Sequence, residues 1–186
     1  KDLEHVEKFK SFINASNKIH NKFAMGKTYY RLQIRDKIMS ENLVKNGCFQ
    51  SKSLTVKFPN INIVPDELLR HFVRGYFDGN GCISSCKHFY LISLDSSKYF
   101  LDGIVEKLQL KQNVFARNGQ GYEWRTSQRS KVMRFLNYIY KESKIYLNRK
   151  YDLYLKCAVL DSNIENNKWT KSVKSSLNTD NTEIII

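Results

Sequence analysis

The segment covering residues 65–83, PDELLRHFVRGYFDGNGCI, constrains the fold of this chain more than any other. Its apolar residues recur at helical spacing and form one stripe, which consists of Leu68, Leu69, Phe72, Val73, Tyr76 and Phe77. Pro65 and Asp66 favour a helix start, and residues 78–81 are expected to end the helix, because Gly and Asn accept positive φ angles. Residues 82–88 have the pattern of a strand. The segment therefore predicts a helix, a turn and a strand.

Two details of this segment go beyond an ordinary capped core helix. Gly75 lies inside the helix, where glycine costs about 1 kcal/mol relative to alanine, and a close approach of another backbone would explain it. An acid, an amide and glycines also gather at the helix end, where oxygen ligands could hold a hard cation. On spacing alone, a core helix with a tight turn is the more common interpretation.

Residues 73–81, VRGYFDGNG, resemble the motif of the LAGLIDADG homing endonucleases in its FxRGYFDGDG form. The resemblance implies two such helices packed side by side, with Gly75 at the interface of the helix pair. It implies that Mg²⁺ is held by the acid at the eighth motif position and the carbonyl before it, which are Asn80 and Gly79 here. Asp78 matches the other acid of the motif, which mainly supports the turn.

Asn80 is the point where this sequence departs from the family motif. An amide oxygen can touch a cation but brings no negative charge, and Mg²⁺ binds mainly through carboxylates and substrate phosphates. Three explanations stay open: a natural residue in a degenerate DNA-binding relative, a substitution that traps uncut DNA, or deamidation of Asn80 to Asp.

The charge of the chain predicts a polyanionic partner. The 186 residues carry a formal net charge of +13 at pH 7, and residues 161–186, with three lysines and four acids, contribute none of this excess. Nucleic acid is favoured over a membrane, since no stretch approaches the ~18 apolar residues of a spanning helix and the chain does not open on a signal peptide. We expect an intracellular protein, from a bacterial or phage-host cytoplasm or an organelle.

The four cysteines form no pair at the spacing typical of a zinc site. Free thiols in a reducing compartment are therefore the favoured interpretation for Cys48, Cys82, Cys86 and Cys157.

The order of predicted elements occurs twice, at an offset of about 95 residues. The first unit, residues 1–62, has a helix, a hairpin that turns near Met25-Gly26 and a second helix, predicted over 2–13, 18–35 and 36–45. The second unit, residues 63–160, follows the motif helix with the same order, over 96–110, 113–127 and 129–143, and a final helix that ends near Leu160. The polar residues 161–186 are expected to be disordered.

The fold class expected from this repeat is α+β. The resemblance implies two pseudo-symmetric αββαββα units with curved antiparallel DNA-binding sheets. The first unit lacks its motif helix, whose counterpart would lie upstream of Lys1. With that helix present, we expect a monomer with internal pseudo-symmetry.

Polar residues on the hairpins are predicted to contact double-stranded DNA, because a two-stranded ribbon fits the major groove and its outward side chains reach base edges. Near the end of the first hairpin, apolar and polar residues alternate, as on a half-buried strand. Any single outward residue could instead be the solvated face of a sheet. The predicted contacts are Lys18, His20, Lys22, Arg31, Gln33 and Arg35 in the first unit and Ser84, Lys87, His88, Arg117, Glu123, Arg125 and Ser127 in the second.

Lys52 and Lys150 occupy corresponding connectors in the two units. By resemblance, they are basic residues that stabilise the transition state of metal-assisted strand hydrolysis, and with Asn80 and Asp78 they are the predicted catalytic residues. Both lysines could also be ordinary surface residues.

The expected function is a site-specific endonuclease that makes a Mg²⁺-dependent double-strand cut in a long asymmetric DNA site. Asn80 and the absent first motif are expected to impair cutting. The alternatives are a non-cutting DNA-binding regulator and an intron RNA maturase, and an intein context is also possible.

Overall fold

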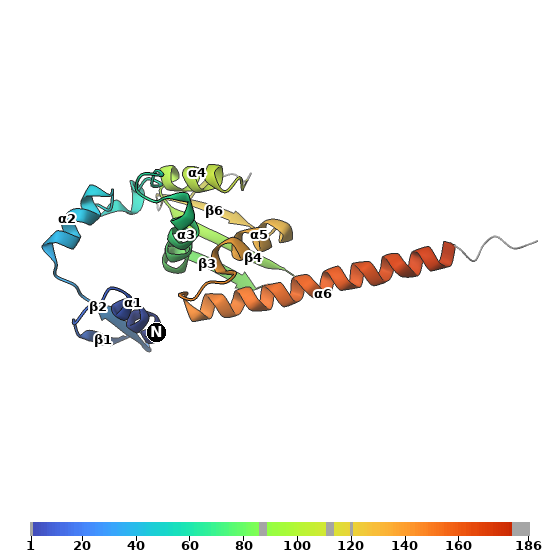
Figure 1. Cartoon of the computed structure of the whole chain (residues 1–186), viewed down its shortest axis with the longest axis horizontal. Helices are drawn as coiled ribbons and strands as arrows, with labels where there is room; N and C mark the ends of the chain where they lie inside the picture. The colour runs from blue at the N-terminus through green and yellow to red at the C-terminus, as the bar shows by residue number, and fades with distance from the viewer. Residues whose placement is uncertain (1, 86–88, 111–113, 120, 180–186) are drawn as a thin grey trace, which may run out of the picture.

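The computed structural model describes the backbone of residues 2–85, 89–110, 114–119 and 121–179, and side chains within these ranges as far as Asn163. The described residues form a mixed α+β fold with two antiparallel sheets (Figure 1). Among them, no helix combines the length and the apolar character that crossing a membrane requires. Cys48, Cys82 and Cys157 are free thiols, as predicted, and Cys86 lies outside the described residues.

The N-terminal region consists of two helices and a hairpin. Its elements are α1 (Leu3–Phe12), β1 (Ile19–Ala24), β2 (Lys27–Leu32), α2 (Lys37–Lys45) and the 3₁₀ turn η1 (Lys52–Leu54). Met25 and Gly26 both have positive φ angles, 50° and 70°, which suit a two-residue turn between right-twisted strands. The predicted hairpin and its turn are therefore confirmed.

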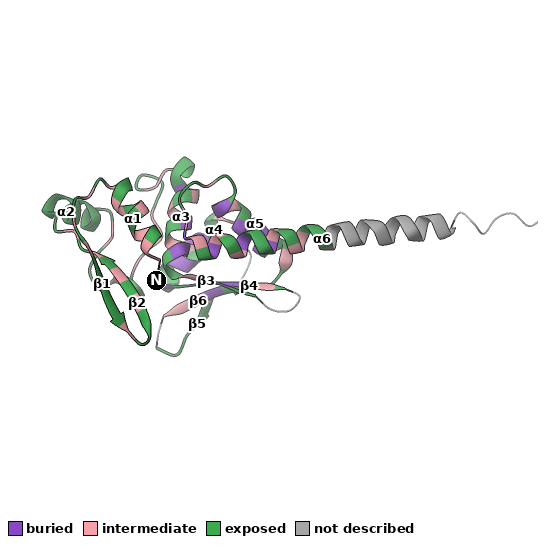
Figure 2. Cartoon of the chain, turned by 90° about the horizontal axis from the view of Figure 1, so that it is seen from below, coloured by how far each residue is buried: buried purple, intermediate pink, exposed green. Residues whose placement is uncertain are grey.

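The C-terminal region has the element order αββαββα, followed by a long helix. The elements are α3 (Asp66–Asn80), β3 (Gly81–Ser85), β4 (Tyr90–Ser96), α4 (Lys98–Lys107), β5 (Val114–Ala116), β6 (Tyr122–Thr126), α5 (Arg129–Tyr140) and α6 (Asn148–Thr179). The sheet has the order β3-β4-β6-β5, and α3, α4 and α5 cover one of its faces (Figure 2).

The hydrophobic core lies between this sheet and its three helices. In the register of the sheet, Ile83 lies opposite Ile92, and Leu94 lies opposite Trp124, so these four side chains point to the same face. There they meet the buried stripe of α3, including Val73 and Phe77, and the buried faces of α4 and α5. The apolar stripe predicted for the motif helix therefore packs in the core of the C-terminal region.

The connector before α3 packs against this core. The Phe58 ring contacts Phe72 and Phe100 edge-on, and the Ser97 hydroxyl donates to the Val56 carbonyl. Val56 and Phe58, which precede the predicted second unit, therefore pack with the C-terminal region.

Two predicted helix ends are wrong. The motif helix does not stop in a turn of positive φ: α3 continues through Asn80, and Gly81, with φ of −90°, begins β3 directly. The final helix does not end near Leu160, and residues 161–179, predicted to be disordered, continue α6. The chain from 148 to 179 contains neither Gly nor Pro, the residues that most often end helices.

Candidate nucleic-acid interface

One face of the β1–β2 hairpin carries the exposed basic residues. His20 lies opposite Arg31, and Lys22 lies opposite Tyr29. All four are exposed, as are Lys18, Gln33 and Arg35, whereas Tyr30, Leu32 and Ile34 are half-buried. The predicted alternation is therefore confirmed, and the six predicted residues of the first unit are all exposed to solvent.

The hairpin has an acid-free sequence. Residues 14–35 hold five basic residues and no Asp or Glu; the five are Lys18, Lys22, Lys27, Arg31 and Arg35. Among the described residues, none of these five forms an ion pair with a carboxylate, and Arg31 donates to the amide oxygen of Gln33 at 3.5 Å. A cluster of uncompensated cations on a ribbon creates a field that attracts polyanions.

The outer face of the four-stranded sheet has a different character. Ser84, Arg117, Arg125 and Ser127 are exposed and Glu123 is half-buried, so the predicted contacts are on the surface. However, both arginines are paired with acids: Arg117 Nη1 lies 2.8 Å from Asp95 Oδ2, and Arg125 Nη1 lies 3.8 Å from Glu123 Oε2. The predicted contacts Lys87 and His88 lie outside the described residues.

Sequence reasoning missed Asp95 and Phe115 on this outer face. On β4, the exposed Asp95 lies between the buried Leu94 and Ser96, and the alternation of polar and apolar residues along this strand could have placed Asp95 on the outer face. The guanidinium of Arg125 lies over the Phe115 ring, 5.6 Å from its centre. Figure 2 shows that the hairpin and this sheet lie on the same side of the helices.

The motif acid Asp78 lies inside the protein, with 6% of its surface exposed. Its Oδ1 accepts from the Tyr140 hydroxyl at 2.6 Å, and its Oδ2 accepts from the Leu147 amide at 3.0 Å. Burial, together with the negative charge of Asp78, raises the pKa of Tyr140 well above its ordinary value. The resemblance implied that Asp78 supports a turn after the helix. Instead, Asp78 joins α3 to α5 and to the residue before α6.

Lys150 is also buried, with 3% of its surface exposed. Its Nζ donates to the carbonyls of Phe77, Asp78 and Gly81 at 2.6, 2.9 and 2.5 Å. Burial, and secondarily the nearby Arg149, lower the pKa of Lys150 to about 8. The ammonium therefore satisfies the carbonyls at the end of α3, where a helix leaves acceptors without partners and favours a cation.

This cap explains the strand that begins directly after the motif helix. Because Lys150 satisfies the last carbonyls, no left-handed residue is needed there. Gly81 is required for space, since a Cβ at this position would lie 2.2 Å from the Phe77 ring. The expectation that Lys150 lies in a connector is wrong: it belongs to α6. Lys52, in contrast, is half-buried at the start of η1, so the two lysines occupy different environments.

The end of the motif helix offers few oxygen ligands for the expected Mg²⁺. Asn80 and Gly79 are exposed, but both oxygens of Asp78 already accept hydrogen bonds. Among the described residues, no group of three or more His, Cys, Asp or Glu side chains could hold a metal ion. The residues present therefore do not fit a Mg²⁺ site on their own, because such sites depend on carboxylates.

The expected helix pair at Gly75 is not formed within the described chain. Gly75 is exposed on α3, and a Cβ built there would meet no atom of the described residues within 4 Å. The close approach that would explain the glycine is thus not made by any element in the described part of the chain.

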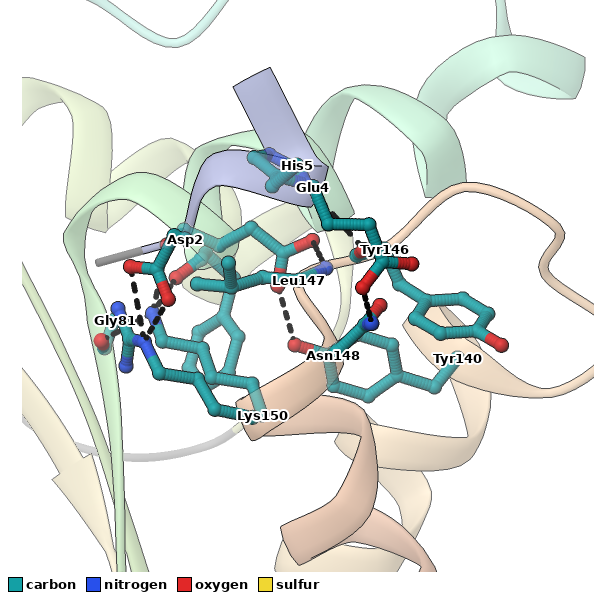
Figure 3. Close-up of polar contacts among 12 residues, drawn as sticks. Asp2, Glu4, His5, Gly81, Tyr140, Tyr146, Leu147, Asn148 and Lys150 are labelled. Atoms are coloured by element: carbon teal, nitrogen blue, oxygen red, sulfur yellow. Dashed lines mark hydrogen bonds and ion pairs between the residues drawn. The ribbon is translucent and has the colours of Figure 1, made fainter. Parts of the chain in front are cut away.

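The start of α1 meets the motif corner through polar contacts that the sequence did not indicate. Glu4 accepts from the side-chain amide of Asn148 at 2.6 Å, and Asp2 lies 3.3 Å from Arg149 Nε. His5 Nδ1 lies 3.3 Å from the Tyr146 carbonyl. Figure 3 draws Asp2 beside Gly81 and Lys150. These contacts attach the N-terminal region to the residues around the start of α6.

The chain was compared with known protein families and with curated proteins. No family model matches it, and no curated protein is significantly similar to it. The functional assignment therefore depends on the hairpin, the outer sheet face and the corner at the end of α3.

Proposed function

We propose that this protein binds double-stranded DNA at a specific, long and asymmetric site, in the manner of the homing endonucleases whose motif it resembles. The observation that carries the proposal is the exposed face of the β1–β2 hairpin, with five cations and no acid in residues 14–35. A two-stranded ribbon of this kind fits the major groove, where Arg reads guanine and Gln reads adenine.

The two kinds of basic residue on the hairpin have different tasks in this proposal. Lysines such as Lys22 neutralise phosphates, which supplies affinity and makes it depend on salt. Arg31 and Gln33, held together by their hydrogen bond, reach base edges and supply sequence preference. The expectation of a monomer and of an intracellular location in a reducing compartment is part of the same proposal.

A binding test uses the full chain and a pool of duplexes with a randomised centre. We expect selection to enrich a defined site, with affinity that falls steeply as salt rises. The variant Lys22→Ala/Arg31→Ala should bind the selected duplex at least about tenfold more weakly, since a base contact contributes roughly 1–3 kcal/mol and loss of a phosphate contact weakens binding further.

The matched control removes two exposed lysines from α2, Lys37→Ala/Lys45→Ala, and should retain most of the affinity. Equal losses in both double variants, or no enrichment of any duplex, would contradict the proposal. Preferential binding of structured RNA over duplex DNA would favour the maturase alternative.

The second candidate function is Mg²⁺-dependent cutting of the bound DNA. Its supporting observation is that Asn80 and Gly79 are exposed at the end of α3, where a carboxylate at position 80 would be accessible to a metal and a phosphate. Against it, Asp78 and Lys150 are both committed to internal hydrogen bonds. We therefore propose that the chain with Asn80 binds its site without efficient cutting.

The cutting test uses a plasmid that carries the selected site, with and without Mg²⁺. We expect no double-strand cut by the chain with Asn80 and a gain of nicking or cutting by Asn80→Asp. Mass spectrometry of the peptide that contains residue 80 controls for deamidation. Cutting by intact Asn80 protein would overturn the non-cutting assignment, and no gain on Asn80→Asp would leave DNA binding as the whole function.

A further inference from the structure

Two carboxylates face each other on the outer surface of the four-stranded sheet. Asp95 on β4 lies directly opposite Glu123 on β6 in the strand register. Like charges at opposed positions of a sheet destabilise it, and a pair of acids on a surface that meets DNA also repels phosphates. The position of this pair therefore needs an explanation.

Two arginines neutralise the acids from either side. Arg117 follows β5, the edge strand, and reaches over β6 to Asp95 on β4. Arg125 lies two residues from Glu123 on the same face of β6, with its guanidinium over Phe115. We call Asp95, Glu123, Arg117 and Arg125 the sheet network; its formal charge is zero.

The sheet network contrasts with the hairpin on the same side of the molecule. The hairpin offers cations without acids, and the network offers two arginines that are already paired. A phosphate gains little at the network, because it must break an ion pair and approach a carboxylate. A base edge can gain more there, since Glu and Asp accept from the cytosine amino group and Arg donates to guanine.

We infer that the sheet network makes DNA binding sequence-selective. Its acids suppress phosphate binding at the sheet, and its ion pairs are exchanged only for contacts with matching base edges. The inference rests on the proposed DNA binding. It adds the network to Arg31 and Gln33 as a second source of selectivity, while the hairpin lysines supply affinity. Asp95 and Glu123 are the specificity-determining residues of the network. They accept hydrogen bonds from matching bases and keep Arg117 and Arg125 away from phosphates.

The test neutralises both acids with the near-isosteric variant Asp95→Asn/Glu123→Gln in the full chain. Fluorescence anisotropy measures binding to the selected duplex and to a mixed-sequence duplex over a salt series. We expect mixed-sequence binding to tighten by about tenfold or more, with a log–log salt slope that steepens by about one to two, because two arginines become free for phosphates. The ratio between selected and mixed duplexes should fall.

The matched control is Asp102→Asn/Glu106→Gln on α4, which makes the same charge change on the helix side and also frees a paired cation, Lys98. If the control tightens mixed-sequence binding as much as the network variant, net charge explains the effect and the inference fails. Unchanged affinity and salt slope in the network variant also overturn it.

A second variant, Arg117→Gln/Arg125→Gln, keeps the inference testable if the first does not fold. It leaves two opposed carboxylates without their arginines, so mixed-sequence binding should be weaker than that of the unmodified chain. Circular dichroism checks that the fold is retained, and unchanged binding would overturn the inference. If the unmodified chain binds no duplex at all, the proposed function fails. If it binds and the network variants do not change its selectivity, only this inference fails.

Discussion

Residues 2–50 and residues 56–163 share an order of elements but differ in packing. Helix, hairpin and helix follow one another in α1–β1–β2–α2 and again in α4–β5–β6–α5. Among the described residues 2–62, none is buried. In contrast, α4 has three buried residues, Phe100, Leu101 and Ile104, and α5 has six.

The difference shows that an amphipathic pattern needs a second layer. The apolar side of α2, including Ile38 and Leu43, is largely exposed, although its spacing resembles that of a core helix. In the C-terminal region, α3 and the four-stranded sheet supply the surface on which α4 and α5 pack. A two-stranded hairpin is too small to bury two helices, and such hairpins are only marginally stable alone.

The largest expected effect compares one phenylalanine from each region. Phe100→Ala on α4 removes a fully buried ring and should lower the free energy of unfolding by about 3–5 kcal/mol. Phe12→Ala on α1, where the ring is 72% exposed, should change it by at most ~0.5 kcal/mol. Chemical denaturation measures both. A large loss for Phe12→Ala would show that the N-terminal region has a core in solution.

The second prediction concerns Asp78, which joins elements that are distant in the sequence. Asp78→Ala leaves the Tyr140 hydroxyl and the Leu147 amide without an acceptor and should cost about 2–4 kcal/mol. Tyr140→Phe is the matched variant and should lose less, because Asp78 keeps one donor. Thermal unfolding followed by circular dichroism measures the losses, and equal stability of Asp78→Ala and the unmodified chain would contradict the buried junction.

The third prediction concerns the helix cap at the motif corner. Lys150→Met removes one donor from each of three carbonyls, of which that of Phe77 keeps the Gly81 amide, and should cost about 1–3 kcal/mol. Lys52→Met, at the half-buried start of η1, is the matched control and should lose less.

The stabilisation by Lys150 should depend on pH with a defined sign. Its pKa is about 8 in the folded protein and near 10.5 in the unfolded chain, so between these values the unfolded chain holds more protons. The free energy of unfolding of the unmodified chain should therefore rise with pH relative to Lys150→Met over this window. Denaturation at several pH values measures the gap, and a gap that narrows as pH rises would contradict the buried environment of the ammonium.

The smallest expected effect concerns the contacts that attach α1 to the start of α6. Asp2 pairs with Arg149 at the surface, and such pairs contribute about 0–1 kcal/mol. Asp2→Asn should therefore change the free energy of unfolding within this range, far less than Asp78→Ala. Hydrogen exchange of the β1–β2 amides should be equally insensitive. A loss comparable to that of Asp78→Ala would mean that the N-terminal region is held more firmly than its burial indicates.

Much of the local structure could be predicted from the sequence. The apolar stripe of α3, the turn at Met25-Gly26 and the alternation around Tyr30 to Ile34 depend on neighbouring residues, so spacing reports them directly. Exposure of the hairpin cations follows from the same alternation. The end of α3 was predicted wrongly, because its cap comes from Lys150, some 70 residues away in the chain, and no local pattern indicates such a partner.

Most helices, the first hairpin and the positive charge could be predicted from the amino-acid sequence, since they depend on residue type and on the spacing of a few residues. The environment of the charged groups, in contrast, depends on the folded chain: Asp78 is joined to Tyr140, Lys150 donates to three carbonyls, and Arg117 and Arg125 pair with Asp95 and Glu123. The physical reason is that a charge responds to whatever the fold brings within a few ångströms, and those neighbours come from strands and helices distant along the chain.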